Sequence, residues 1–301
     1  MTIPPFITPG SKIRIVSPAG KCTAEQVLPA VGWLKECGYR VETGKNLLSC
    51  YYQYAGTDQE RLSDLQAALD DPDAKAIICT RGGYGMIRLI DQLDLSRFRK
   101  HPKWVAGYSD ITVLHNRLHI SGFPSVHGTM CRGFYNEEGQ IREDVHSLIN
   151  ILQGGKPEYN FPVSPHNRPG TVSAKLTGGN LSLLYSLAGT PYDVDTAGKI
   201  LFIEDISEYL YHIDRMMVSL RLAGKLKYLA GLIVGQFSEV KDNEDPFGKT
   251  VEEIIRDAVR DYDFPVGFGF PAGHEHPNLA LRLGSACKLK ITGKHCSLKL
   301  M

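Results

Sequence analysis

Strand-like and helical stretches alternate throughout the first half of this 301-residue chain. Short stretches typical of β-strands occupy residues 12–20, 39–42, 74–80 and 104–107, and stretches with apolar residues at helical spacing occupy 24–37 and 58–69. Strands that are separated by helices pair in parallel, and the helices then cover both faces of the sheet. The alternation therefore predicts an α/β domain with a parallel sheet, whose ligand crevice lies at the carboxyl ends of the strands.

The second half of the chain follows a segment that has no periodicity. Residues 153–170 are rich in Gly, Pro and Asn, a composition typical of a boundary. Because 301 residues exceed the usual size of one domain, we expect two. The expected parts are a first domain over 1–152, a linker over 153–170, and a second domain over 171–301 with strands near 171, 200, 229, 279, 288 and 298 and helices at 209–222 and 251–259.

The composition argues against several classes of partner. Hydrophobic residues make up 43% and charged residues 22% of the chain, which is ordinary for a globular protein. A net charge of +1 gives no electrostatic reason to bind nucleic acid or an anionic membrane, and no apolar run approaches the roughly 20 residues of a spanning helix.

The first residues do not read as a signal peptide. The seven cysteines are scattered and include no Cys-x-x-Cys, so we expect reduced thiols, a cytoplasmic location and no structural metal site.

The segment Gly107-Tyr-Ser-Asp110 joins an apolar strand directly to a helical pattern. A sharp strand-to-helix turn of this kind lifts a serine hydroxyl above the sheet, and N–H groups at the helix start point at the atom that it attacks. Ser109 is therefore a candidate nucleophile, and the N–H of Asp110 is a candidate donor to an oxyanion. The alternative is that Ser109 or Asp110 only caps the helix, because both residue types are favoured caps and the segment lacks the second glycine of Gly-x-Ser-x-Gly.

An acid and a histidine that could complete a catalytic triad follow strand-like segments in the second half. Glu204 ends an apolar strand and precedes Asp205 and Glu208, so it is the best placed of the three acids to be buried and to fix a histidine ring. His274 lies on a Gly/Pro-rich loop that also carries His276. As alternatives, Glu204 caps a helix or pairs with a nearby arginine, and the two histidines bind zinc. The chain lacks the His-Glu-x-x-His pattern and the paired cysteines of zinc sites.

The glycine-rich loop Arg81-Gly-Gly-Tyr-Gly85 follows the third strand. It lacks the Gly-x-Gly-x-x-Gly and Gly-Lys-Ser/Thr patterns of nucleotide-binding loops. Glycines also let a backbone approach a substrate closely and present N–H groups to a developing negative charge, while a tight turn without a ligand is the alternative. Cys79, which precedes the loop, is a second candidate nucleophile, although its apolar neighbours favour a buried and inert thiol.

Six motifs taken together resemble the serine LD-carboxypeptidases, a family of muramoyltetrapeptide carboxypeptidases that also contains the microcin C self-immunity peptidases. The motifs are Arg81-Gly-Gly-Tyr-Gly85, Gly107-Tyr-Ser-Asp-Ile-Thr112, Gly178-Gly-Asn-Leu181, Ile203-Glu-Asp205, Tyr211-x-Ile-Asp-Arg215 and Gly273-His274. They occur in the order of the family and span nearly the whole chain. The resemblance implies a Rossmann-like first domain similar to class I glutamine amidotransferases, a smaller swivelling β/α second domain, and a homodimer.

The resemblance also implies a site and a reaction. The site residues carried over by motif are the nucleophile Ser109, the acid Glu204, the base His274, the oxyanion N–H donors of Gly83 and Asp110, and three candidate substrate-binding residues, Arg81, Tyr84 and Asn180. No metal or other cofactor is expected. The implied reaction removes the terminal D-alanine from a cytoplasmic murein tetrapeptide in peptidoglycan recycling. Two alternatives stand beside it: the same chemistry on microcin C-like peptide-nucleotide conjugates or other short peptides, and a non-catalytic Rossmann-like module that binds a nucleotide or metabolite.

Overall fold

The computed structural model describes all residues, 1–301, and the chain divides into two compact units. The first unit comprises Met1–Gly155 with Leu279–Arg282, and the second comprises Lys156–Asn278 with Leu283–Met301. The chain thus passes between the units three times. The segment 153–170, where we expected a linker, contains a strand, β6 (Glu158–Phe161), which pairs with β13 (Cys296–Leu300) in the second unit.

The first unit is built on a six-stranded sheet with the order β11-β5-β4-β3-β1-β2. Its strands are β1 (Lys12–Val16), β2 (Arg40–Thr43), β3 (Ala74–Cys79), β4 (Trp104–Gly107), β5 (Ser125–His127) and β11 (Leu281–Leu283). Strands β1 to β5 pair in parallel, as the alternation predicts. The order β2-β1-β3-β4-β5 is that of flavodoxin-like doubly wound sheets, which bind ligands where the order reverses, between β1 and β3.

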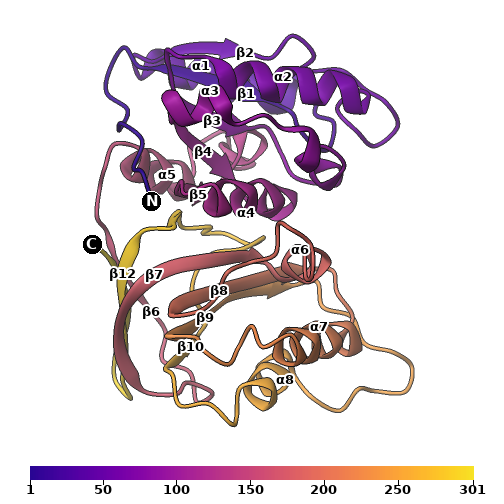
Figure 1. Cartoon of the computed structure of the whole chain (residues 1–301), viewed down its shortest axis with the longest axis vertical. Coiled ribbons are helices and arrows are strands. Elements are labelled where there is room, and N and C mark those ends of the chain that lie inside the picture. The colour runs from indigo at the N-terminus through magenta and orange to yellow at the C-terminus, as the bar shows by residue number, and fades with distance from the viewer. The chain divides into compact units, whose positions relative to one another are not determined.

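Helices connect these strands on both faces of the first sheet (Figure 1). They are α1 (Ala24–Glu36), α2 (Asp58–Asp70), α3 (Ser96–Lys100), α4 (Thr112–Ile120) and α5 (Glu143–Leu152), with 3-10 turns η1 (Met86–Arg88), η2 (Ile90–Gln92), η3 (Ser109–Ile111) and η4 (Cys131–Gly133). The β1-to-β2 and β3-to-β4 connections run in opposite directions across the sheet. Because such crossovers are right-handed, α1 and α3 lie on opposite faces. Ile15, Ile77 and Val105 in the central strands are accordingly fully buried.

The second unit is built on a seven-stranded mixed sheet with the order β10-β9-β8-β7-β12-β13-β6. Its remaining strands are β7 (Gly170–Asn180), β8 (Lys199–Ile206), β9 (Gly231–Ser238), β10 (Val266–Phe268) and β12 (Ala286–Ile291). Strands β7 to β10 are parallel, whereas β12 is antiparallel to β7 and to β13, and β13 is antiparallel to β6.

Three helices pack on the parallel half of this sheet: α6 (Leu181–Ser186), α7 (Leu210–Leu222) and α8 (Val251–Ala258) (Figure 1). Leu184, Met216 and Ile255 from these helices share one apolar core with Ile203 and Val234 from the strands. The methionines of α7 are therefore packing residues, as their spacing predicts. No helix in either unit has both the length and the apolar character that crossing a membrane requires.

Candidate active site

Ser109 lies at a sharp turn between β4 and the helix that follows it. All four residues of β4 are buried, and η3 and α4 begin at once after Tyr108. Ser109 has a φ of +60°, which is rare for a residue other than glycine and is typical of strained functional positions. A Cβ atom at Gly107 would lie 2.9 Å from the side chain of Ile111, so only glycine lets the helix fold back so closely over the strand end. The segment thus has the geometry of a nucleophile elbow.

The side chains at this turn do not cap the helix. No side-chain capping hydrogen bond is made at the start of η3 or of α4. Instead, the buried carboxylate of Asp110 accepts a hydrogen bond of 2.8 Å from the N–H of Met86, just after the glycine-rich loop. The capping alternative for Ser109 and Asp110 therefore has no support in their contacts.

The glycine-rich loop packs directly on the Ser109 hydroxyl. A Cβ atom at Gly82 would lie 3.0 Å from Ser109 Oγ and 3.3 Å from the nitrogen of Asp110, so a side chain there would collide with the elbow. The carbonyl of Gly82 accepts a hydrogen bond of 2.9 Å from the N–H of Gly20. Because the C=O and N–H of a trans peptide point in opposite directions, the N–H of Gly83 points away from Gly20. Ser109, Asp110 and the loop that contains Gly83 are thus brought together within the first unit.

Glu204 and His274 form a hydrogen-bonded pair within the second unit. Glu204 lies near the carboxyl end of β8 and is fully buried, and His274 lies on the loop after β10. His274 Nδ1 is 2.7 Å from Glu204 Oε2. Burial by itself lowers the pKa of His274, but the hydrogen bond and the negative charge of Glu204 outweigh it, and the pKa is raised above the ordinary 6.5. Glu204 thus stabilises the imidazolium form of this histidine and fixes its ring.

Gln236, at the end of β9, holds the loop that carries His274. Its Oε1 accepts a hydrogen bond of 2.9 Å from the N–H of Glu275, and its Nε2 donates one of 3.1 Å to the carbonyl of Pro277. The N–H of Gly273 donates to Asn278 Oδ1 at 3.2 Å. Gln236 was not predicted from the sequence, where the only signal that marks it is its position near the carboxyl end of an apolar strand.

The second acid of the Glu204-Asp205 pair has a different role. Asp205 accepts hydrogen bonds from Asn180 Nδ2 at 2.9 Å and from the N–H of Ser182 at 2.8 Å. Burial, reinforced by the charge of Glu204, raises the pKa of Asp205 to about 7. Asn180 caps α6 by accepting from the N–H of Leu183. The buried Asn180, a candidate for binding substrate, therefore holds the start of α6 and orients Asp205.

Arg81 and Tyr84, the candidate substrate-binding residues of the glycine-rich loop, and their neighbour Arg88 differ in their surroundings. Arg81 donates to the carbonyl of Lys21 at 3.1 Å, and Tyr84 is 47% exposed. Arg88 forms an ion pair with Asp58.

The structure gives less support to the two alternatives to a serine site, a Cys79 nucleophile and a metal site. Cys79 is fully buried, and burial raises the pKa of its thiol to about 12, so this cysteine is inert at neutral pH. No group of three or more His, Cys, Asp and Glu side chains is placed to hold a metal ion.

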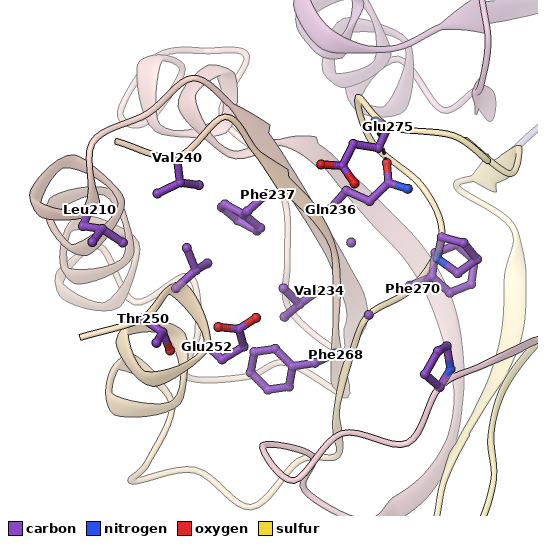
Figure 2. Close-up of a pocket in the computed structure, with 15 residues that line it drawn as sticks. Leu210, Val234, Gln236, Phe237, Val240, Thr250, Glu252, Phe268, Phe270 and Glu275 are labelled. Atoms are coloured by element: carbon purple, nitrogen blue, oxygen red, sulfur yellow. Dashed lines mark hydrogen bonds between the residues drawn. The ribbon is translucent and has the colours of Figure 1, made fainter. Parts of the chain in front are cut away.

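A pocket of about 590 Å³ lies in the second unit beside the loop that carries His274. Its walls come from the ends of β9 and β10 and from the starts of α7 and α8 (Figure 2). The apolar side chains of Val234, Phe237 and Phe268 face it, and Gln236 and Glu275 are joined by their hydrogen bond at one end. The pocket thus borders the loop of His274, which contributes Gly269, Phe270, Pro271 and Glu275 to its lining.

Residues 13–128 match the LD-carboxypeptidase N-terminal domain, and residues 173–289 match the LD-carboxypeptidase C-terminal domain. The chain is 36% identical over 299 residues to a probable murein peptide carboxypeptidase of Bacillus subtilis. The aligned region covers 97% of this chain and 92% of the relative.

Solved structures give the same picture. The crystal structure of muramoyltetrapeptide carboxypeptidase from Oxalobacter formigenes is 30% identical with a TM-score of 0.87, over 96% of this chain and 98% of that chain. The microcin C7 self-immunity protein MccF, in a complex with aspartyl sulfamoyl adenosine, has a TM-score of 0.86 at 22% identity, over 99% of this chain and 98% of that one, and this likeness concerns the fold alone.

Matches to both domain models, and a relative at 36% identity over almost the full length, go beyond a shared fold. The chain therefore belongs to the LD-carboxypeptidase family and is a serine-type carboxypeptidase.

Proposed function

We propose that this protein removes the terminal D-alanine from murein tetrapeptides by an acyl-enzyme mechanism. Ser109 is the nucleophile, His274 is the general base and Glu204 orients the histidine. The single observation that carries the proposal is the contact of 2.7 Å between His274 Nδ1 and the buried Glu204 Oε2, because it fixes the tautomer that a general base needs. The strained elbow at Ser109 supports the assignment of the nucleophile.

The proposed reaction proceeds in two halves. Ser109 Oγ attacks the carbonyl carbon before D-alanine while His274 takes the serine proton at Nε2, and the N–H groups of Gly83 and Asp110 bind the resulting oxyanion. His274 then returns the proton to the leaving amine of D-alanine, and water hydrolyses the acyl-enzyme by the same steps. Loss of one oxyanion donor typically costs about 3–4 kcal/mol of transition-state stabilisation.

The substrate and the setting follow from the relatives. The Bacillus subtilis and Oxalobacter formigenes proteins are named for murein peptide and muramoyltetrapeptide. We extend that substrate class to this chain, with Arg81 and Tyr84 as candidates for binding the peptide, and with a role in peptidoglycan recycling. The proposal includes a cytoplasmic location, which seven unpaired cysteines favour. It also includes a homodimer, a first domain like that of class I glutamine amidotransferases and a second domain that swivels.

The decisive experiment measures D-alanine release from murein tetrapeptide by Ser109→Ala, with Ser63→Ala as the matched control. Ser63 lies on the exposed side of α2 and bonds only the carbonyl of Glu60, so its loss leaves activity intact. We expect Ser109→Ala to lose essentially all activity while remaining folded. A Ser109→Ala protein that released D-alanine at the normal rate would refute the proposal.

The second candidate substrate is a peptide-nucleotide conjugate, which the likeness to MccF with bound aspartyl sulfamoyl adenosine favours. Turnover of murein tetrapeptide should be compared with turnover of aspartyl sulfamoyl adenosine under the same conditions. Exclusive cleavage of the conjugate would reassign the substrate and leave the triad in place. Labelling of Ser109 by a serine-directed reagent, lost in His274→Ala, would separate either enzyme from a non-catalytic binding module.

A further inference from the structure

The peptide group between Gly85 and Met86 is held from both sides by buried charged residues. Its carbonyl, that of Gly85, accepts a hydrogen bond of 2.9 Å from Arg61 Nη1. Its N–H, that of Met86, donates a hydrogen bond of 2.8 Å to Asp110 Oδ2. Since the C=O and N–H of a trans peptide point in opposite directions, the guanidinium and the carboxylate grip this peptide from opposite sides.

Arg61 also ties the end of the glycine-rich loop to the loop after β1. Its Nη1 donates at 2.7 Å to the carbonyl of Pro18, two residues before Gly20, whose N–H binds the Gly82 carbonyl. Arg61 is only 1% exposed, although it carries a full charge. A Cβ atom at Gly85 would lie 2.5 Å from Arg61 Nη1, so the close approach of the guanidinium depends on glycine at that position. Arg61 therefore holds both the end of the glycine-rich loop, at Gly85, and the segment at Pro18 that precedes the Gly20 contact with this loop.

Asp110 connects this loop to the nucleophile itself, because it follows Ser109 directly. Its carboxylate is 1% exposed, and burial raises its pKa to about 6. Burial of a carboxylate costs free energy that a hydrophobic residue would not. Asp110 therefore has two parts with different roles. Its backbone N–H is the proposed oxyanion donor, and its carboxylate holds the glycine-rich loop through the N–H of Met86.

We propose that Arg61 and Asp110 are positioning residues that hold the glycine-rich loop so that the N–H of Gly83 faces the oxygen on which negative charge develops. This inference rests on the proposed serine mechanism. Both side chains are almost completely buried, so they act through the loop and not by contact with the substrate. Their effect is on the rates of acylation and deacylation, because the oxyanion forms in both steps, and not on the binding of the intact peptide.

The test compares Asp110→Ala, Asp110→Asn and Arg61→Lys with the wild-type enzyme on murein tetrapeptide. Asp110→Ala removes the acceptor for the Met86 N–H, and we expect kcat to fall about 10- to 100-fold while KM changes less than about threefold. Asp110→Asn keeps an acceptor oxygen and should recover most of the loss. Arg61→Lys cannot bridge the carbonyls of Pro18 and Gly85 with the same geometry, and kcat should fall about tenfold.

Asp64→Ala is the matched control. Asp64 is also a buried acid of the first unit, but it accepts hydrogen bonds from the N–H and the side chain of Asn46. We expect this variant to lose stability and keep kcat within about twofold, because its partners lie outside the glycine-rich loop. Affinity for a peptide boronate that forms a tetrahedral adduct with serine is the second readout. It should fall in parallel with kcat for Asp110→Ala and Arg61→Lys only.

The outcomes distinguish a failure of the positioning role from a failure of the proposed serine mechanism. Wild-type kcat in a folded Asp110→Ala protein, an equal loss in Asp110→Asn, or a matching loss of kcat in Asp64→Ala would overturn the positioning role. If Asp110→Ala does not fold, Arg61→Lys decides, and an unchanged boronate affinity there would also overturn it. Activity retained by Ser109→Ala would instead refute the proposed function.

Discussion

Ser109 is held in a left-handed backbone conformation, and this strain should be measurable. With φ at +60°, any residue with a Cβ atom pays about 1–2 kcal/mol there, whereas glycine does not. Ser109→Gly should therefore be more stable than Ser109→Ala by about 1 kcal/mol in urea unfolding, after allowance for the greater flexibility of glycine in the unfolded chain.

Ser63, in the interior of α2, provides the control with the opposite sign. There the glycine variant should be less stable than the alanine variant by about 0.5–1 kcal/mol. Equal effects at the two positions would contradict a strained backbone at Ser109.

His274 should set the acidic limit of activity. A general base must be neutral, and Glu204 raises the pKa of His274 above 6.5 in spite of burial. The acidic limb of the pH profile of kcat/KM should therefore have its midpoint above pH 6.5. Glu204→Gln, which keeps the shape but removes the charge, should move this limb to lower pH while lowering kcat. A midpoint that does not move in Glu204→Gln would show that another group titrates.

The same pair makes stability depend on pH. Because the folded-state pKa of His274 is raised, its stabilising effect is fully present below the ordinary pKa of 6.5 and is lost as pH rises through the folded-state pKa. Urea unfolding of the wild type and of His274→Gln should therefore differ most at the acidic end of this range. A difference that grew toward alkaline pH would be contrary to this expectation.

At the level of elements, the contact between the glycine-rich loop and the elbow predicts a selective loss of activity. Alanine at Gly82 would place its Cβ 2.9 Å from Ser109 Cβ, so the loop must move away from the nucleophile. We expect kcat to fall at least about tenfold, with a smaller effect on stability. Gly32→Ala, in α1 where a Cβ meets open space, should stabilise by about 0.5–1 kcal/mol and keep full activity. Equal activity in the two variants would contradict this packing.

The regular elements could be predicted because their sequence patterns are local. The parallel strands β1, β3 and β4 are short stretches rich in apolar residues, and the structure confirms their pairing. β6 was missed because it has only four residues and lies between Pro157 and Pro162. The short apolar run near residue 279 was expected, but its place in the first sheet, as β11, depends on long-range pairing that no local pattern carries.

Some residues of the candidate site could likewise be predicted from local sequence patterns, whereas others could not. Ser109, Glu204 and His274 stand at strand ends, where a sequence pattern points to them. The contacts of Arg61 with Gly85 and of Gln236 with Glu275 join segments 24 and 39 residues apart, and no spacing rule brings those atoms together. Buried polar side chains of this kind emerge only once the register of neighbouring strands and loops is known.

At the level of the whole molecule, the return of residues 279–282 should matter for the stability of the first unit. Arg282 donates to the carbonyl of Gly155 at 2.8 Å and lies over the ring of Trp104. A fragment of residues 1–155 lacks these contacts and leaves the edge of β5 unpaired, a condition that favours association. Size-exclusion chromatography should show self-association, and appending 279–283 through a flexible linker should raise the melting temperature. The control carries the residues of 279–283 in scrambled order. A fragment 1–155 that is monomeric, and whose melting temperature does not change when 279–283 are added, would contradict this role of β11.

The three crossings of the chain between its units also constrain protein engineering. The loop that carries His274 leaves β10 and runs directly into β11. A chimera of two relatives joined at a single point near residue 155 would therefore graft a foreign edge strand onto the host's sheet together with the foreign histidine loop. Exchanging substrate preference cleanly would take three splice points, so that the host keeps its own residues 279–282.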